Sequence, residues 1–102
     1  MDMKQMMKQA RKMKQQLEEV QNQLKEVEVD ATAGGGMVKA TVFASGEVKS
    51  IEIDKEAVDP EDVELLQDMI VAAVNEAIRS AQELSNQRMS SIAGGMNIPG
   101  LF

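Results

Sequence analysis

VEVDATAGGGMVKATVFASGEVKSIEID, residues 27–54, sets the architecture of this chain. Apolar and polar residues alternate in three short runs, which are separated at Gly34–Gly36 and at Ser45-Gly46. Alternation with a period of two is typical of strands that bury one face, and glycine-rich breaks favour tight turns. The stretch therefore predicts a three-stranded antiparallel meander over about residues 27–54. Val48 is out of phase with Ile51, which predicts a bulge or a late strand start.

A long helix is predicted before the strands, over residues 3–27. Its apolar residues are spaced alternately three and four apart: Met3, Met6, Ala10, Met13, Leu17, Val20, Leu24 and Val27. This unbroken heptad pattern is typical of a helix that packs against another helix. At about 1.5 Å per residue the helix would be nearly 40 Å long, which is too long for a compact monomer of this size.

A second helix is predicted over residues 60–89. Asp59 suits the N-cap, and Pro60 suits the first helical position because its missing N–H has no partner there anyway. The first half of this segment is apolar on more than one side, whereas the part after Arg79 is polar. Glycine and proline in residues 94–102 predict a flexible tail.

The order of helix, three strands and helix predicts an α+β fold, with residues 1–93 forming a single domain. Its apolar residues are spread along two long helices and a small sheet, and a monomer could not cover all of them. We therefore expect a homodimer in which strands or helix faces are shared between the subunits.

The composition excludes most catalytic chemistry. The 102 residues include no His, Cys, Tyr or Trp and only two Phe. Without His or Cys, the chain lacks the most common proton shuttles, soft-metal ligands and thiol nucleophiles. We expect no enzymatic activity, no cofactor, no metal and no small-molecule substrate. The opening residues lack a signal-peptide core, and no apolar run approaches a membrane span, so we expect a cytoplasmic protein that does not bind membranes.

Two other segments have a structural and a functional interpretation. The segment from Glu52 to Asp68 carries eight acids and one Lys. It lacks the alternating oxygens and central glycine of a calcium loop, so a solvated face with helix capping is favoured over a metal site. Gly34–Gly36 is followed by a strand rather than by Lys-Ser/Thr and a helix, so a hairpin turn is favoured over a phosphate-binding loop.

The strongest functional signal is a stripe of positive charge on the first helix. The first sixteen residues have a net charge of +4 in a chain of net charge −6. Lys4, Lys8 and Arg11 fall opposite the apolar seam at 100° per residue, and Lys12 and Lys14 flank them.

This stripe is either an ordinary solvated face or a binding site for an anion. Like charges three or four residues apart cost about 0.2–0.5 kcal/mol per pair, and cations near a helix N-terminus oppose the helix dipole. Among the first sixteen residues only Asp2 is acidic, which would not offset both costs. This pattern favours an external partner that carries negative charge, and phosphate is the obvious candidate. Because proteins that bind single strands use aromatic stacking platforms, the scarcity of aromatics favours the backbone of a duplex.

The chain resembles the YbaB/EbfC family of small bacterial nucleoid-associated proteins. The resemblance rests on MKQMMKQARKMKQQLEEVQ (3–21), the strand stretch 27–54, DPEDVELLQDMIVAAVNEAI (59–78) and the ending PGLF. It implies a tweezer-like homodimer whose helical arms bind and bend or bridge DNA, with roles in nucleoid organisation and gene regulation. The residues that it implicates in DNA contact are the charged residues of the arms: Lys4, Lys8, Arg11, Lys12 and Lys14 on the first helix, and Arg79 and Arg88 on the second.

A different class of function also fits the sequence. Several of the nine Met residues lie on the heptad seam, and flexible Met side chains adapt well to varied partners. A coiled-coil adaptor or chaperone-like scaffold, holding a protein partner through this seam, is therefore the alternative to DNA binding.

Overall fold

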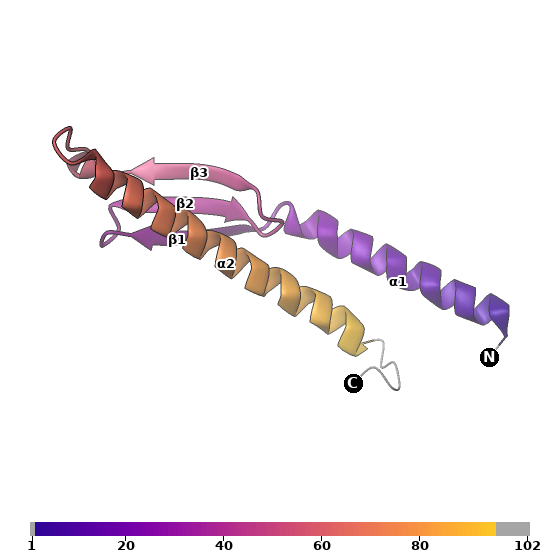
Figure 1. Cartoon of the computed structure of the whole chain (residues 1–102). Coiled ribbons are helices and arrows are strands. Elements are labelled where there is room, and N and C mark those ends of the chain that lie inside the picture. Colours follow the sequence, from indigo (N-terminus) through magenta and orange to yellow (C-terminus); the bar gives the residue numbers. More distant parts are fainter. Residues whose placement is uncertain (1, 96–102) are drawn as a thin grey trace.

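The structure, a computed structural model, describes residues 2–95, with side chains through residue 92. A helix, three strands, a short 3₁₀ turn and a second helix follow one another along the chain: α1 (Met3–Leu24), β1 (Glu28–Ala33), β2 (Val38–Phe43), β3 (Val48–Ile53), η1 (Lys55–Ala57) and α2 (Val63–Gly95) (Figure 1). The two long helices and the antiparallel sheet confirm the predicted α+β fold.

The three strands form a simple meander in the order β1-β2-β3. Thr41 pairs with Ser50 but Val42 pairs with Val48, so Lys49 is the extra residue in β3. This register shift confirms the predicted irregularity at Val48. The first hairpin turns at Gly34–Gly36, where all three residues have positive φ angles. Glycine adopts this backbone region without the steric cost that a Cβ would add.

The core lies between α2 and one face of the sheet. Ala73, Ala77 and Ala81 follow one another every four residues on α2, and all three are fully buried. Val38 and Val42 of β2 are also fully buried in the same cluster. Small side chains on the helix allow its backbone to lie close to the sheet, so the core is thin.

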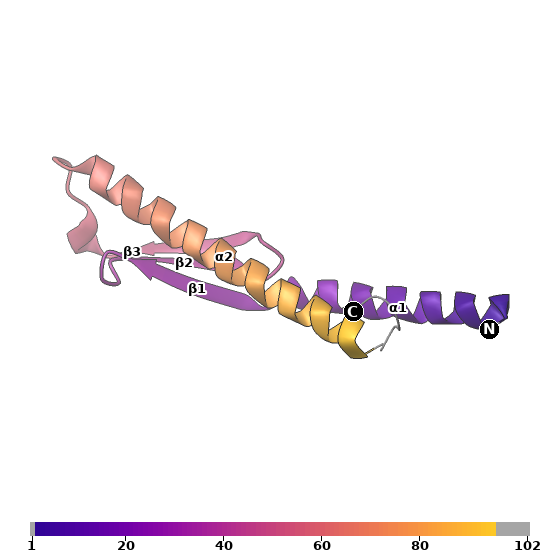
Figure 2. The same cartoon turned by 60° about the horizontal axis from the view of Figure 1, so that its bottom comes forward.

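The molecule is elongated because α1 packs against little of the sheet. Its principal dimensions are 70 × 23 × 16 Å, and α1 leaves the sheet as an arm of 22 residues, which is about 33 Å of helix. Figures 1 and 2 show α2 running back from the far end of the sheet, with its last turns approaching the part of α1 nearest the sheet. The first half of α1 extends beyond the end of α2.

The first helix begins at Met3 as predicted, but its predicted C-terminal limit was wrong. The prediction extended the helix to residue 27, but α1 ends at Leu24. Val27 instead lies just before β1, where its carbonyl accepts a hydrogen bond from the backbone N–H of Ala44 (2.7 Å). The Leu24 carbonyl likewise accepts from Ser45 (3.1 Å).

The limits predicted for the second helix, 60–89, were also wrong. Asp59 and Pro60 form a turn before the helix, in which the Asp59 carbonyl accepts from the N–H of Asp62 (3.0 Å). Asp62 supplies the cap, since its Oδ1 accepts from the N–H of Leu65 (3.2 Å). At the other end α2 continues to Gly95. The first two residues of the predicted tail 94–102 therefore belong to the helix. Residues 96–102 lie outside the described part of the chain.

Candidate nucleic-acid interface

A side-chain N-cap stabilises the start of α1, the arm. Asp2 has extended backbone geometry, and its Oδ1 accepts a hydrogen bond from the N–H of Gln5 (2.9 Å). This cap satisfies one of the free N–H groups at the start of α1. No glycine or proline follows within the helix, so the cations that follow the cap are carried on continuous helix.

All five predicted cations of α1 are exposed: Lys4, Lys8, Arg11, Lys12 and Lys14. Beyond its cap, α1 has no acid in its first turn and no base in its last turn, which is the reverse of the arrangement that the helix dipole favours. Among the described residues, none of the five lies within 4.0 Å of a carboxylate oxygen. Their charge is therefore available to an external anion.

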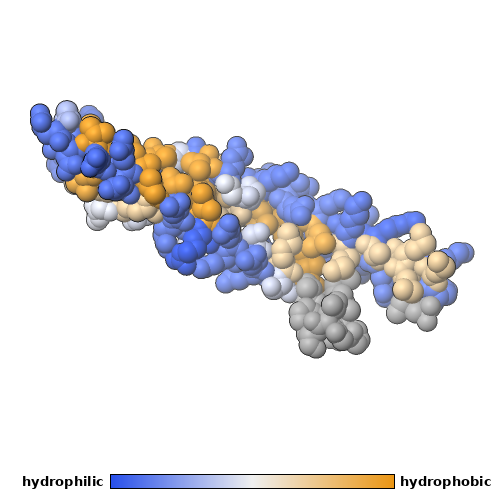
Figure 3. Space-filling view, in the orientation of Figure 1, coloured by the Kyte–Doolittle hydropathy of each residue, from blue (hydrophilic) through white to orange (hydrophobic). Residues whose placement is uncertain are grey.

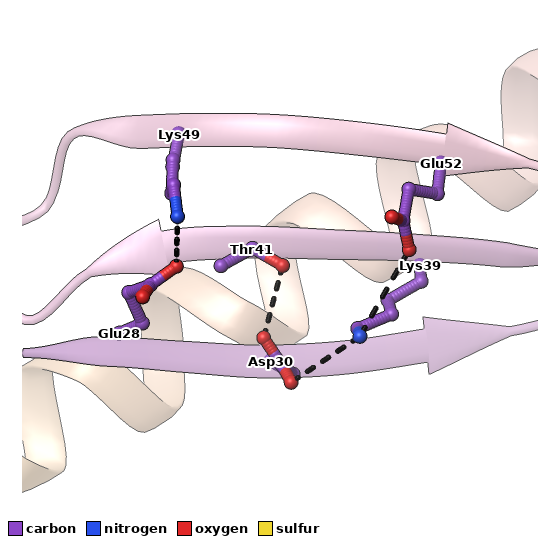
Figure 4. Close-up of polar contacts among 6 residues, drawn as sticks. All are labelled: Glu28, Asp30, Lys39, Thr41, Lys49 and Glu52. Atoms are coloured by element: carbon purple, nitrogen blue, oxygen red, sulfur yellow. Dashed lines mark hydrogen bonds and ion pairs between the residues drawn. The ribbon is translucent and has the colours of Figure 1, made fainter.

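The lysines of the sheet are in a different situation. On the sheet face opposite α2, Lys49 pairs with Glu28, and the Lys39 Nζ lies 3.6 Å from Asp30 and 3.9 Å from Glu52 (Figure 4). The Asp30 carboxylate also accepts a hydrogen bond from the Thr41 hydroxyl (2.9 Å). These pairs leave the polar face of the sheet without an excess of positive charge, so the sheet is a poor site for a polyanion.

Arg79, which was predicted to contact DNA, is engaged within its own helix. Its guanidinium contacts the carboxylates of Glu76, three residues earlier, and Glu83, four residues later. The hydrogen bond and the charge of Arg79 lower the pKa of Glu76 below its ordinary value of 4.5, and Glu76 raises the pKa of Arg79 in return. Two carboxylates around one guanidinium make this site negative overall.

Arg88 is the other cation predicted on α2, and it is half-buried. It follows the fully buried Ala81 by seven residues, which places both on the same side of the helix. Arg88 therefore faces inward, and the structure brings neither α2 arginine into the exposed cationic row of α1.

Sequence reasoning missed the two partners of Arg79. The signal was present, because Glu76 and Glu83 stand at the i−3 and i+4 positions at which oppositely charged side chains meet on a helix. It also missed a shallow hollow of about 460 Å³ on the arm, where the amides of Gln5 and Gln9 lie beside Lys8 and Lys12. That hollow places hydrogen-bonding amides next to the cations.

A second exposed feature is apolar and lies on β3 and the first half of α2, away from the start of α1 (Figure 1). Val48, Ile51 and Ile53 of β3 remain 39–43% exposed because α2 packs mainly on β1 and β2. Val63, Leu65 and Val71 on the first half of α2 are also exposed. Figure 3 shows the most hydrophobic residues gathered over this part of the molecule.

These features define a small α+β protein that presents one cationic helical arm per chain. In residues 2–95 no group of three or more acidic side chains is arranged to hold a metal ion, and neither long helix is apolar enough over its described length to cross a membrane. Within the described residues, the exposed cations of the arm and the exposed apolar surface are features of a protein that binds other molecules.

Comparison with known proteins identifies the family. The model of the YbaB/EbfC DNA-binding family matches residues 1–96, and the chain belongs to this family, which confirms the resemblance seen in the sequence. A nucleoid-associated protein of Alkaliphilus metalliredigens is 55% identical over 101 residues, covering 99% of this chain and 89% of that protein. A nucleoid-associated protein of Pelotomaculum thermopropionicum is 52% identical, covering 99% and 96%. These names describe DNA-associated proteins rather than enzymes.

A solved structure shares the fold. The crystal structure of the uncharacterized protein HP0035 from Helicobacter pylori superposes with a TM-score of 0.76 at 26% sequence identity. The match covers 94% of this chain and 97% of that one, so it includes the arm as well as the sheet.

Proposed function

We propose that this protein binds duplex DNA through the cationic face of α1, mainly by contacts to phosphates. The observation that carries the proposal is the row of five exposed cations without a carboxylate partner among the described residues. Release of condensed counterions from the phosphates favours binding of such a row whatever the base sequence. Membership of a DNA-binding family supports the same ligand.

The choice of a duplex rests on what the surface lacks. Single-strand binding uses exposed aromatic rings on which bases stack. Phe43 is half-buried on the sheet, and Phe102 is the only other aromatic residue of the chain. A continuous helix with a charged face suits contact along the phosphate backbone, which fixes position without reading sequence.

We further propose that two copies form a homodimer through the exposed apolar surface of β3 and the first half of α2. Exposed apolar patches that continue over neighbouring elements are typical of protein interfaces, and a symmetric pair would cover the patch on both chains. The dimer would present two arms, which could straddle or bridge a duplex and so alter its conformation. On this basis the protein acts in the cytoplasm at the nucleoid, with effects on gene expression.

A charge-matched pair of variants tests the DNA site. Lys4→Glu with Lys8→Glu and Lys25→Glu with Lys55→Glu change the net charge equally, but only the first pair lies on the cationic row. Lys25 and Lys55 are also exposed, so neither pair disturbs the core. In a mobility-shift assay with duplex DNA at low salt, the arm variant should lose binding and the control should retain most of it.

Circular dichroism and light scattering should show unchanged helicity and unchanged mass for both variants. Equal losses in the two variants would mean that net charge, not the arm, controls binding. Full binding by the arm variant would remove α1 as the site.

A further inference from the structure

The side of α1 opposite the cations is apolar, and its first half has no cover. Met3 and Met6 on this side are 79% and 56% exposed. Further along the same helix, Leu17 is half-buried and Leu24 is buried. Nothing within residues 2–95 of the same chain covers the first two turns of this face, which we call the methionine face (Met3, Met6 and Ala10).

The end of α2 lies beside α1, just where the methionine face begins. Ser91 and Ile92 share a hollow of about 390 Å³ with Lys12, Gln16 and Val20 of α1. The two helices run in opposite directions (Figures 1 and 2). At its end at Gly95, α2 therefore points along α1 toward Met3 and the uncovered part of the arm (Figures 1 and 2).

The chemistry of the continuing segment suits that face. Residues 96–102 read MNIPGLF and contain no charged side chain. Five of the seven residues are apolar: Met96, Ile98, Pro99, Leu101 and Phe102. Proline at position 99 opposes a further helical turn and favours an extended chain, because it removes a backbone N–H donor and restricts the residue before it.

The length of the segment also fits. Seven extended residues span at most about 23–25 Å, whereas the helix from Met13 back to Met3 is about 15 Å long. The segment can therefore reach the first turn of α1 with length to spare.

We propose that residues 96–102 dock in extended form on the methionine face of α1 in the same chain. The occupied arm then exposes its cations while its apolar side is covered, so that it offers one binding face rather than two. Each docked apolar side chain leaves water together with the methionine that it contacts, which is the source of the attraction.

A single tryptophan reports on this docking. The chain contains no Trp, so Phe102→Trp gives an unambiguous fluorescence signal. We expect a blue-shifted emission maximum and reduced quenching by acrylamide. Adding Met3→Gln and Met6→Gln to the reporter chain should shift the emission to that of exposed indole.

The matched control adds Lys4→Gln and Lys8→Gln, which place the same new residue in the same turns but on the cationic face. That control should leave the emission blue-shifted. Circular dichroism checks that α1 remains helical in both variants, as expected because all four positions are exposed.

Three results would overturn the proposal. An exposed indole in the Phe102→Trp chain alone would mean that the segment does not dock, which leaves the methionine face to another protein. Emission that stays blue-shifted with Met3→Gln and Met6→Gln would place the segment elsewhere. Co-refolding the reporter chain with an excess of Trp-free chain carrying those two changes distinguishes the remaining case. A shift to exposed indole in that mixture would show that the segment docks on a second copy.

Discussion

Lys8 and Arg79 should respond differently to the same substitution, although both were predicted to contact DNA. Lys8 is exposed with no carboxylate within 4.0 Å among the described residues, whereas Arg79 is held between Glu76 and Glu83. With about five phosphate contacts per dimer, log K should fall with log salt at a slope near −4.5, since each contact contributes about −0.9. Lys8→Gln removes one cation from each arm, so two lost contacts should reduce the slope to about −2.7.

Arg79→Gln should leave the slope near that of the unmodified protein. The assay is fluorescence anisotropy with a short labelled duplex over a range of salt concentrations, applied to the unmodified protein and to both variants. The Lys8 variant should bind more weakly at low salt, and the difference should shrink as salt rises. If the salt dependence of log K falls as much in the Arg79 variant as in the Lys8 variant, Arg79 also contacts phosphate. That result would refute the conclusion that its ion pairs with Glu76 and Glu83 keep it from DNA. A flat salt dependence of the unmodified protein would refute phosphate contact altogether.

Three further predictions concern the ion pair, the first hairpin and the dimer. The pKa of Glu76 should lie below 4.5 in the unmodified protein and rise in Arg79→Gln, as measured by NMR titration. Because the folded pKa is the lower one, the stabilisation is present at neutral pH and is lost as pH falls through that lowered pKa. Gly34→Ala should destabilise the protein more than Gly35→Ala in urea unfolding. Both residues have φ near +65° (64° and 66°), but only at Gly34 would a Cβ overlap the Met69 side chain; the backbone conformation alone costs about 1–2 kcal/mol. Ile51→Glu with Ile53→Glu should convert the dimer to folded monomers in light scattering, and an unchanged mass would place the interface elsewhere.

The strands and the first helix were predictable because their signals are local. Alternation along 27–54 and the heptad spacing of Met6, Ala10 and Met13 each report the period of the element that contains them. The start of α2 was harder, because Asp59 and Asp62 are chemically equivalent as caps. The Asp59 Oδ1 accepts from the N–H of Glu61 (2.9 Å) within the turn, which leaves Asp62 to cap the helix.

The surroundings of the candidate site residues were predictable only in part, for a similar reason. The periodicity of α1 places Lys4, Lys8 and Arg11 on its outer face, and the structure shows them exposed. Whether Arg79 is free to bind an external anion depends on its ion pairs with the residues at i−3 and i+4. Whether Arg88 is exposed depends on which side of α2 faces inward. The apolar residues of β3 could be assigned to a face from their pattern, but whether α2 covers that face depends on where the helix crosses the sheet. That crossing is a tertiary property that no local pattern contains.

The most direct test of the central claim, that the cationic face of α1 is the DNA site, is an NMR titration of ¹⁵N-labelled protein with a short duplex. The backbone amides of residues 4–14 should show the largest shift changes, while those of β1, β2 and β3 should change little. Shift changes concentrated on the sheet or around Arg79, with the amides of α1 unmoved, would contradict it.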